Sequence, residues 1–317
     1  MFSRKELSDL FENEVKYEFF AKVMQINDST YATKPITVLT EDNEMAIVRI
    51  KQEDELSLNK LYYFITEGII FKEKIHLEVK EFKRLSEIEI SDEKREKLMK
   101  FFYNHAPVDT IQIIKDIERI IESLENEVIK NLTKKIYQDK KNDFYLYPAA
   151  TKYHHAYISG LAYHTHSMLR LAKGFLEVYP WLNQDLLLSG IILHDICKIS
   201  EFDSYEGSNY TIKGKLIGHI AMGVSLLDGV AKELNYQDKE EVMLLQHIML
   251  SHHYYGNFGS PKKPNIAEAL MIHFIDNIDS KACVLGEELE LVEKGDLTGP
   301  ISVLERERYY KHKLSKE

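Results

Sequence analysis

Imidazole and carboxylate side chains gather at apolar segments in the second half of this chain. The central pair, His194 and Asp195, follows the apolar run DLLLSGIIL that begins at Asp185. Burying ionisable groups is costly unless they are paired with each other or bound to a metal ion. A single His-Asp step is more often the solvated end of a helix, so its meaning depends on what the rest of the chain supplies.

Other segments supply residues of the same two kinds. In the helix predicted around GLAYHTHSMLRL, His164 lies in register with Met168 and Leu171 on the apolar stripe. His166 lies in register with Arg170, so we expect it to face solvent. The remaining candidates lie within or at one end of apolar helical segments, and they are His219, His252, His253 and Asp276. Delivery of such groups by five separate segments favours a metal site.

The residue types narrow the chemistry of this site. A mixed set of imidazoles and carboxylates suits Mn, Fe, Zn or Mg, and the absence of thiolates argues against a structural zinc site. Lys198 follows His194 by four residues and Asp195 by three, so the three side chains share one side of a helical turn. The ammonium group of Lys198 would neutralise a phosphate oxygen or, alternatively, cap the end of the helix.

The elements that must position these residues fall into two classes. Residues 15–85 are rich in Val, Ile, Tyr and Phe in short runs separated by polar or glycine breaks, which predicts five strands and favours an OB-fold barrel. Such barrels bind single strands by stacking bases on aromatic rings. Candidate contacts are Tyr31, Tyr62, Phe64, Phe71 and His76, with Lys72 and Lys74, although we expect most of these rings to be core. Acidic residues outnumber basic ones in residues 1–90.

From Ser91 the apolar spacing becomes helical, beginning with a serine cap and early acidic residues. We therefore predict an α+β protein of two domains. A five-stranded barrel would occupy residues 1–90, a helical connector 91–145 and an all-α domain 146–317. The chain has 317 residues, which is long enough for two separate cores.

Composition excludes several classes of protein. Apolar residues make up 44% of the chain, no apolar run is long enough to span a bilayer, and the start lacks the apolar core of a signal peptide, so we expect no membrane association. The formal net charge of −10 argues against a general nucleic-acid coat protein. Two cysteines, Cys197 and Cys283, cannot form a disulfide framework and fit a cytoplasmic location.

Five stretches carry a resemblance to a known family: YPAATKYHHAYISGLAYHT, DLLLSGIILHDICK, YTIKGKLIGHI, SHHYYGNFGSPKKP and IDNIDSK. Their order H…HD…H…HH…D resembles the HD-domain superfamily of metal-dependent phosphohydrolases. The stretches themselves resemble the YhaM-type 3′-to-5′ exoribonucleases, in which an OB-fold precedes the HD domain. The sequence departs from this family in the barrel and at Tyr254 and Tyr255, which follow the paired histidines.

The resemblance and the spacing together imply two divalent cations. One would be bound by His164, His194, Asp195 and Asp276, and the other by His219, His252 and His253 with Asp195 as a bridge. We expect Mn²⁺, with Fe²⁺, Co²⁺ or Mg²⁺ as alternatives. Two such ions can share a hydroxide and stabilise both the attacking and the leaving oxygen of a phosphodiester. Asp195 and Lys198 are therefore the expected catalytic residues.

The resemblance further implies hydrolysis of single-stranded RNA to 5′-mononucleotides, with single-stranded DNA as an alternative substrate. Lys152, His154 and His155 lie just before His164 and would bind substrate phosphate, or form a solvated polar loop. Two other interpretations stay open. The chain could be a nucleotide or cyclic-dinucleotide phosphohydrolase whose barrel serves to form a homo-oligomer, or a DNA-binding accessory factor. The complete ligand set speaks against the accessory factor.

Overall fold

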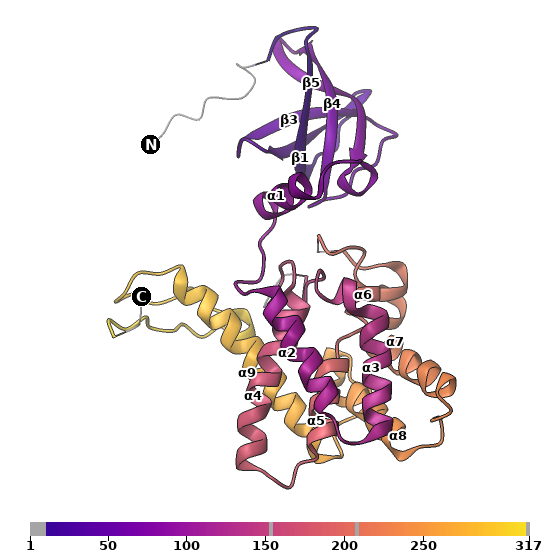
Figure 1. Ribbon diagram of the computed structural model, residues 1–317. Coiled ribbons are helices and arrows are strands. Elements are labelled where there is room, and N and C mark those ends of the chain that lie inside the picture. Colours follow the sequence, from indigo (N-terminus) through magenta and orange to yellow (C-terminus); the bar gives the residue numbers. More distant parts are fainter. Residues whose placement is uncertain (1–10, 152–154, 207–208, 315–317) are drawn as a thin grey trace. The chain divides into compact units, whose positions relative to one another are not determined.

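The computed structural model describes residues 11–151, 155–206 and 209–314 (Figure 1). The chain divides into two compact units, Met1–Asn104 and His105–Glu317. The first unit contains the strands and the second contains most of the helices, which confirms the predicted α+β class.

The first unit is a closed five-stranded barrel with the strand order β1-β2-β3-β5-β4. Its strands are β1 (Lys16–Ile26), β2 (Thr33–Thr40), β3 (Met45–Lys51), β4 (Leu61–Phe71) and β5 (Lys74–Arg84). Neighbouring strands are antiparallel except β3 and β5, which pair in parallel at Val48 and Leu77. Because alternate side chains of a strand point inward, residues such as Val38 and Ile50 form an apolar core. The predicted barrel is confirmed.

The structure separates the aromatic rings of the barrel into two groups. Tyr62 and Phe64 are 2% and 0% exposed and belong to the core, so the candidate role of these two in contacting a strand is wrong. Tyr31 is about half exposed, its ring meets Phe71 edge to face, and the ammonium group of Lys72 lies 4.8 Å from the Tyr31 centroid. Phe71 and His76, with Lys72 in the β4–β5 turn and Lys74 at the start of β5, complete this cluster.

The segment expected to connect the domains is instead divided between them. Helix α1 (Asp92–Phe102), whose Ser91 cap accepts a hydrogen bond from the Lys94 amide, belongs to the first unit after the short 3-10 helix Leu85–Glu87. Helices α2 (Thr110–Ser123) and α3 (Glu127–Phe144) belong to the second unit, because their apolar faces are buried in its core. The boundary therefore lies between Asn104 and His105 rather than at residue 90.

Helix α5 (Gln184–Leu193) is the centre of the second unit. Every residue from Asp185 to Leu193 is buried, and α3, α4 (Gly160–Val178), α8 (Glu240–Ser251) and α9 (Ala267–Glu290) pack against it. The remaining elements are α6 (Lys198–Glu201), α7 (Ile212–Glu233), and the 3-10 helices Gly256–Phe258 and Ser302–Leu304. In the described part of the chain no helix is long and apolar enough to cross a membrane.

Candidate metal centre

The turn after α5 brings His194 and Asp195 into the interior of the helical unit. The helix is capped by His194, whose amide donates to the Gly190 carbonyl at 2.9 Å. At Gly190 an added Cβ would lie 2.5 Å from Cδ1 of Ile272, so a glycine allows α5 to pack closely on α9. The side chains of His194 and Asp195 are both about 2% exposed. Such burial of an imidazole beside a carboxylate requires further partners.

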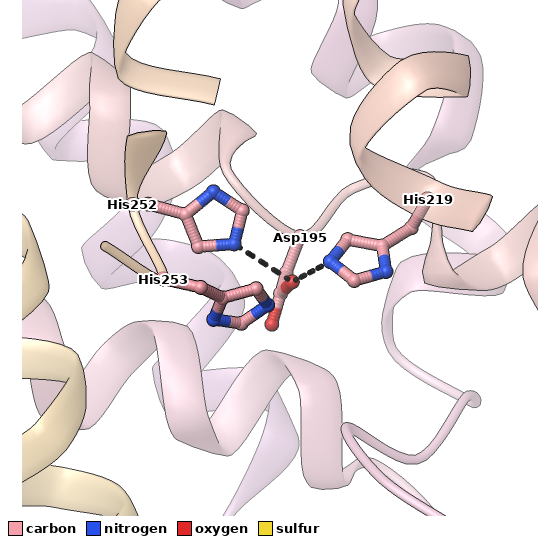
Figure 2. A group of neighbouring side chains, drawn as sticks. All are labelled: Asp195, His219, His252 and His253. Atoms are coloured by element: carbon pink, nitrogen blue, oxygen red, sulfur yellow. Dashed lines mark ion pairs between the residues drawn. The ribbon is translucent and has the colours of Figure 1, made fainter. Parts of the chain in front are cut away.

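The two oxygens of Asp195 face two different groups of histidines. Oδ1 lies 3.2 Å from Nε2 of His219 and 3.9 Å from Nε2 of His252 (Figure 2). Oδ2 lies 3.2 Å from Nε2 of His194 and 3.9 Å from Nε2 of His164. The ligand atoms within each group lie within 4.8 Å of one another, and His253 joins the Oδ1 group. Asp195 is thus common to two clusters that could each hold a cation.

Asp276 lies against both clusters. Its Oδ1 is 3.4 Å from Nε2 of His164, and its Oδ2 is 3.7 Å from Nδ1 of His253. The residue comes from the middle of α9 and is 9% exposed. Burial opposes its ionisation, but a hydrogen bond from His253 and the charges of His164 and His194 hold the pKa of Asp276 well below its usual value. Asp276 was expected to bind one cation only, whereas the structure places it beside both clusters.

Hydrogen bonds orient the imidazoles so that their Nε2 atoms converge. Nδ1 of His194 donates to the Ile191 carbonyl and Nδ1 of His252 to the Met249 carbonyl, each at 2.8 Å. A proton held on Nδ1 leaves a lone pair on Nε2 of a neutral imidazole. Burial and the neighbouring His253 also hold the pKa of His252 well below its usual value, so this ring is neutral.

These inward-facing atoms fit a bound cation. Within the described residues, Nε2 of His194, His219 and His252 and Oδ1 of Asp195 are buried and have no hydrogen-bond partner. Buried polar atoms are rarely left without a partner, and neutral imidazole nitrogens beside a carboxylate are a preferred donor set for divalent transition metals. The arrangement of these residues therefore suits metal ions.

Two carboxylates that were not predicted from the sequence hold the imidazoles of His164 and His219. Nδ1 of His164 donates to Oδ2 of Asp279 at 2.7 Å, and Nδ1 of His219 donates to Oε2 of Glu201 at 3.0 Å. Carboxylates in this position fix the orientation of metal-binding histidines and increase their basicity. The spacing offered a signal for one of them, since Asp279 follows Asp276 by three residues and shares its face of α9.

His155 has a different environment from the expected phosphate-binding loop. Its side chain is 2% exposed, its Nε2 donates to Oδ2 of Asp279 at 2.8 Å, and its Nδ1 accepts from the Tyr157 hydroxyl at 2.8 Å. The expected contact with substrate is therefore wrong, because the ring is enclosed behind His164. The other two residues of that prediction, Lys152 and His154, lie outside the described residues.

A break in α7 delivers His219. Gly218 has φ 77° and ψ 157°, a conformation that is essentially restricted to glycine. The carboxylate of Glu201 accepts hydrogen bonds from both the amide and Nδ1 of His219 at the start of the following helical segment. Gly214 lies so close to the Glu201 carbonyl that an added Cβ would be 2.3 Å from its oxygen. The two glycines thus let α7 approach α6 and turn His219 inward.

Lys198 pairs with Asp195 at the same turn. Its Nζ lies 2.7 Å from Oδ2 of Asp195, and the side chain is 11% exposed. Burial opposes ionisation of both groups, yet the Lys198 ammonium, with His194 and His219, holds the pKa of Asp195 well below its usual value. Asp195 in turn raises the pKa of Lys198 against the same burial. A buried positive charge is therefore held beside the two clusters.

His166 does not face solvent as expected. Its Nε2 donates to Oδ2 of Asp116 at 3.1 Å, and its side chain is 15% exposed. Helix α2 packs against this side of α4, so the polar face predicted from the sequence is covered by a neighbouring helix. The residue remains separate from the converging imidazoles.

Comparisons with known proteins agree with this arrangement. The HD domain model matches residues 161–281. The chain is 43% identical over 210 residues to the 3′-5′ exoribonuclease YhaM of Bacillus pumilus (strain SAFR-032). The aligned region makes up 66% of this chain and 67% of that protein. It is 41% identical over 210 residues to the 3′-5′ exoribonuclease YhaM of Bacillus subtilis (strain 168), with the same coverage.

Proposed function

This chain belongs to the YhaM family of 3′-5′ exoribonucleases, and on that basis we propose that it hydrolyses single-stranded RNA from the 3′ end through a pair of divalent cations. The observation that carries the proposal is the convergence of buried Nε2 atoms, which have no hydrogen-bond partner among the described residues, on the two oxygens of Asp195. The expected products are 5′-mononucleotides. The free thiols of Cys197 and Cys283 support a cytoplasmic site of action.

The residues divide naturally between the two cations. His164, His194 and Asp276 would bind one with Oδ2 of Asp195, and His219, His252 and His253 would bind the other with Oδ1. When bound, the ions lower the pKa of an attacking water and stabilise the charge that develops on the phosphodiester. Mn²⁺ is our first candidate, and Fe²⁺, Co²⁺ and Mg²⁺ are the alternatives, since oxygen and imidazole donors are present without thiolates.

The protein side chains supply orientation and charge. Asp279 and Glu201 keep the Nδ1 protons of His164 and His219 in place, so that each Nε2 remains an acceptor. The Lys198 ammonium group lies beside Asp195 and would neutralise a non-bridging phosphate oxygen of the substrate. Positive charge placed before the reaction begins costs no reorganisation when negative charge develops.

We further propose that the barrel holds the RNA strand. Tyr31 and Phe71 present rings at one end of the barrel, with Lys72 beside both of them. Stacking on such rings contributes about 1–3 kcal/mol per base and does not depend on sequence. Single-stranded DNA has the same stackable bases and phosphates, so it is the alternative substrate to be compared.

A product analysis tests this function. Uniformly labelled single-stranded RNA incubated with the protein and Mn²⁺ is expected to release 5′-mononucleotides from the first time points, and a 3′-phosphate on the RNA is expected to inhibit the reaction. Internal fragments that precede mononucleotides would contradict the proposed polarity. Parallel reactions compare the alternative substrates, which are single-stranded DNA, cyclic dinucleotides and nucleoside triphosphates. Faster turnover of a cyclic dinucleotide or a nucleoside triphosphate than of RNA would mean that RNA is not the preferred substrate.

A further inference from the structure

A second concave site lies on the other side of the turn that carries Asp195. It is a cavity of about 270 Å³ between α3, α6 and α7. One wall comes from α7, with Lys213 and Ile217 before the break at Gly218 and Ala221 and Ser225 after it. The remaining lining residues are Lys140 of α3, Cys197, Ser200, Met222 and Leu226.

The polar groups of this cavity attract anions. Its lining includes the ammonium groups of Lys140 and Lys213 and the hydroxyls of Ser200 and Ser225, and it includes no carboxylate. One acidic residue outside the lining, Glu201, acts on the Cys197 thiol together with the two lysines. Glu201 is itself engaged by His219. The net charge of the lining is thus positive in a chain of formal charge −10.

The two lysines differ from their neighbours on the same helices. On α3, Lys135 pairs with Asp139 at 3.0 Å and Lys141 pairs with Glu118 at 2.6 Å. The side-chain ammonium groups of Lys140 and Lys213 form no ion pair or hydrogen bond with any described residue. Two uncompensated ammonium groups that line one hollow, together with two hydroxyl donors, provide the recognition groups that a phosphate requires.

The rest of the lining is apolar and suits an organic group. Ile217, Met222 and Leu226 lie beside the polar residues, and the thiol of Cys197 is buried. Ligand sites combine mainly apolar walls with a few polar groups that fix orientation, and the volume here is at the small end of their range. We propose that this cavity binds a phosphate monoester the size of a sugar phosphate or a nucleoside monophosphate.

The position of the cavity gives such a ligand contact with two segments of the metal centre. Cys197 lies between Asp195 and Lys198 in the chain, and Ile217 precedes Gly218 and His219. The ligand would therefore touch the back of the turn and the broken helix that deliver three of the inward-facing residues. Lys140 and Lys213 are not among the residues proposed to bind the cations or the RNA, so either proposal can fail without the other.

Equilibrium dialysis of the intact, metal-loaded protein tests the site. The probes are ribose 5-phosphate, AMP and inorganic phosphate, with adenosine as the uncharged comparison. We expect the Lys140→Ala/Lys213→Ala variant to bind one phosphate monoester fewer per chain than the wild type, or to bind it at least tenfold more weakly. Lys215→Ala is the matched control, because it removes an exposed lysine of α7 that does not line the cavity, and it is expected to bind normally.

Alkylation of the thiols provides a second measurement. The thiol of Cys197 is buried and lines the cavity, so its reaction with iodoacetamide is slow, and a ligand in the cavity should slow it further without affecting Cys283. Equal binding of phosphate monoesters by the wild type and the double lysine variant would overturn the proposal, as would binding of adenosine as tight as that of AMP. Inorganic phosphate binding as tightly as AMP would show that the organic group adds nothing and would overturn the stated ligand class. RNA hydrolysis is measured separately, so its failure would refute only the proposed nuclease.

Discussion

Replacing Asp279 by asparagine is the most direct test of how the metal centre is organised. One oxygen of Asp279 accepts hydrogen bonds from Nδ1 of His164 at 2.7 Å and from Nε2 of His155 at 2.8 Å. Burial disfavours its ionisation, but these two hydrogen bonds lower the pKa of Asp279 to about 2. The carboxylate is therefore charged at neutral pH, and Asp279→Asn removes that charge while it preserves the shape of the side chain.

The expected loss follows from the role of Asp279 behind His164. Hydrogen bonds to a charged acceptor are about twice as strong as neutral ones, so the variant holds the imidazole less firmly. Loss of such a partner typically weakens metal binding by about 10–100-fold, which is about 1.4–2.8 kcal/mol. Because the pKa of Asp279 is lower in the folded protein than in the unfolded chain, its charge stabilises the fold fully above the unfolded pKa near about 3.9. This stabilisation is lost as the pH falls toward about 2. The ratio of wild-type to variant affinity should therefore be the same at pH 6.5 and pH 8.

Metal titration with measurement of bound Mn²⁺ at equilibrium checks this expectation. We expect the binding of only one of the two ions to be weakened, because His219, His252 and His253 make no contact with Asp279. Glu290→Gln is the control, since it removes a carboxylate at the exposed end of the same helix. Unchanged affinity for both ions in Asp279→Asn, with a folded protein by circular dichroism, would refute the proposed role of Asp279.

Three further predictions concern the same machinery. Asp195→Asn should abolish RNA hydrolysis while circular dichroism remains that of a folded protein, and it should cost about 1–3 kcal/mol in chemical denaturation because Lys198 loses its charged partner; retained turnover would eliminate the site. His166→Ala should leave kcat within about twofold and reduce stability by about 0.5–1.5 kcal/mol through loss of its hydrogen bond to Asp116. A larger loss of activity would show that His166 belongs to the site. Removal of residues 1–104 should raise the apparent KM for long RNA but not for a dinucleotide, whereas equal losses would mean that the barrel supports the helical unit instead.

Periodicity was enough to predict the main architecture. Alternating apolar residues predicted the barrel, and three- and four-residue spacing predicted the helices and the inward position of His164. These patterns work because each element buries one face against its own domain core. The domain boundary was not predictable in this way, because α2 has the same amphipathic pattern whether it connects two domains or belongs to one of them.

Other features could not be predicted because they depend on contacts between segments that are distant in the sequence. His166 lies on a polar stripe of α4, and only the docking of α2 brings Asp116 to it from 50 residues away. His155 is preceded by polar and aromatic residues, and its burial depends on Asp279 from α9. Glu201 belongs to a four-residue helix too short to show any periodicity. Contacts between distant segments leave no spacing signal in a single sequence.

The break in α7 has a consequence for how this protein can vary. The Glu201 carbonyl accepts from the Thr211 amide at 2.9 Å, and the Glu201 carboxylate holds His219 on the other side of Gly218. Thr211 and His219 are therefore both held by one residue of α6, Glu201, and neither contact involves the chain between Phe202 and Tyr210. Insertions or deletions in that loop can accumulate over evolution without moving His219, whereas replacement of Gly218 or Glu201 displaces it at once.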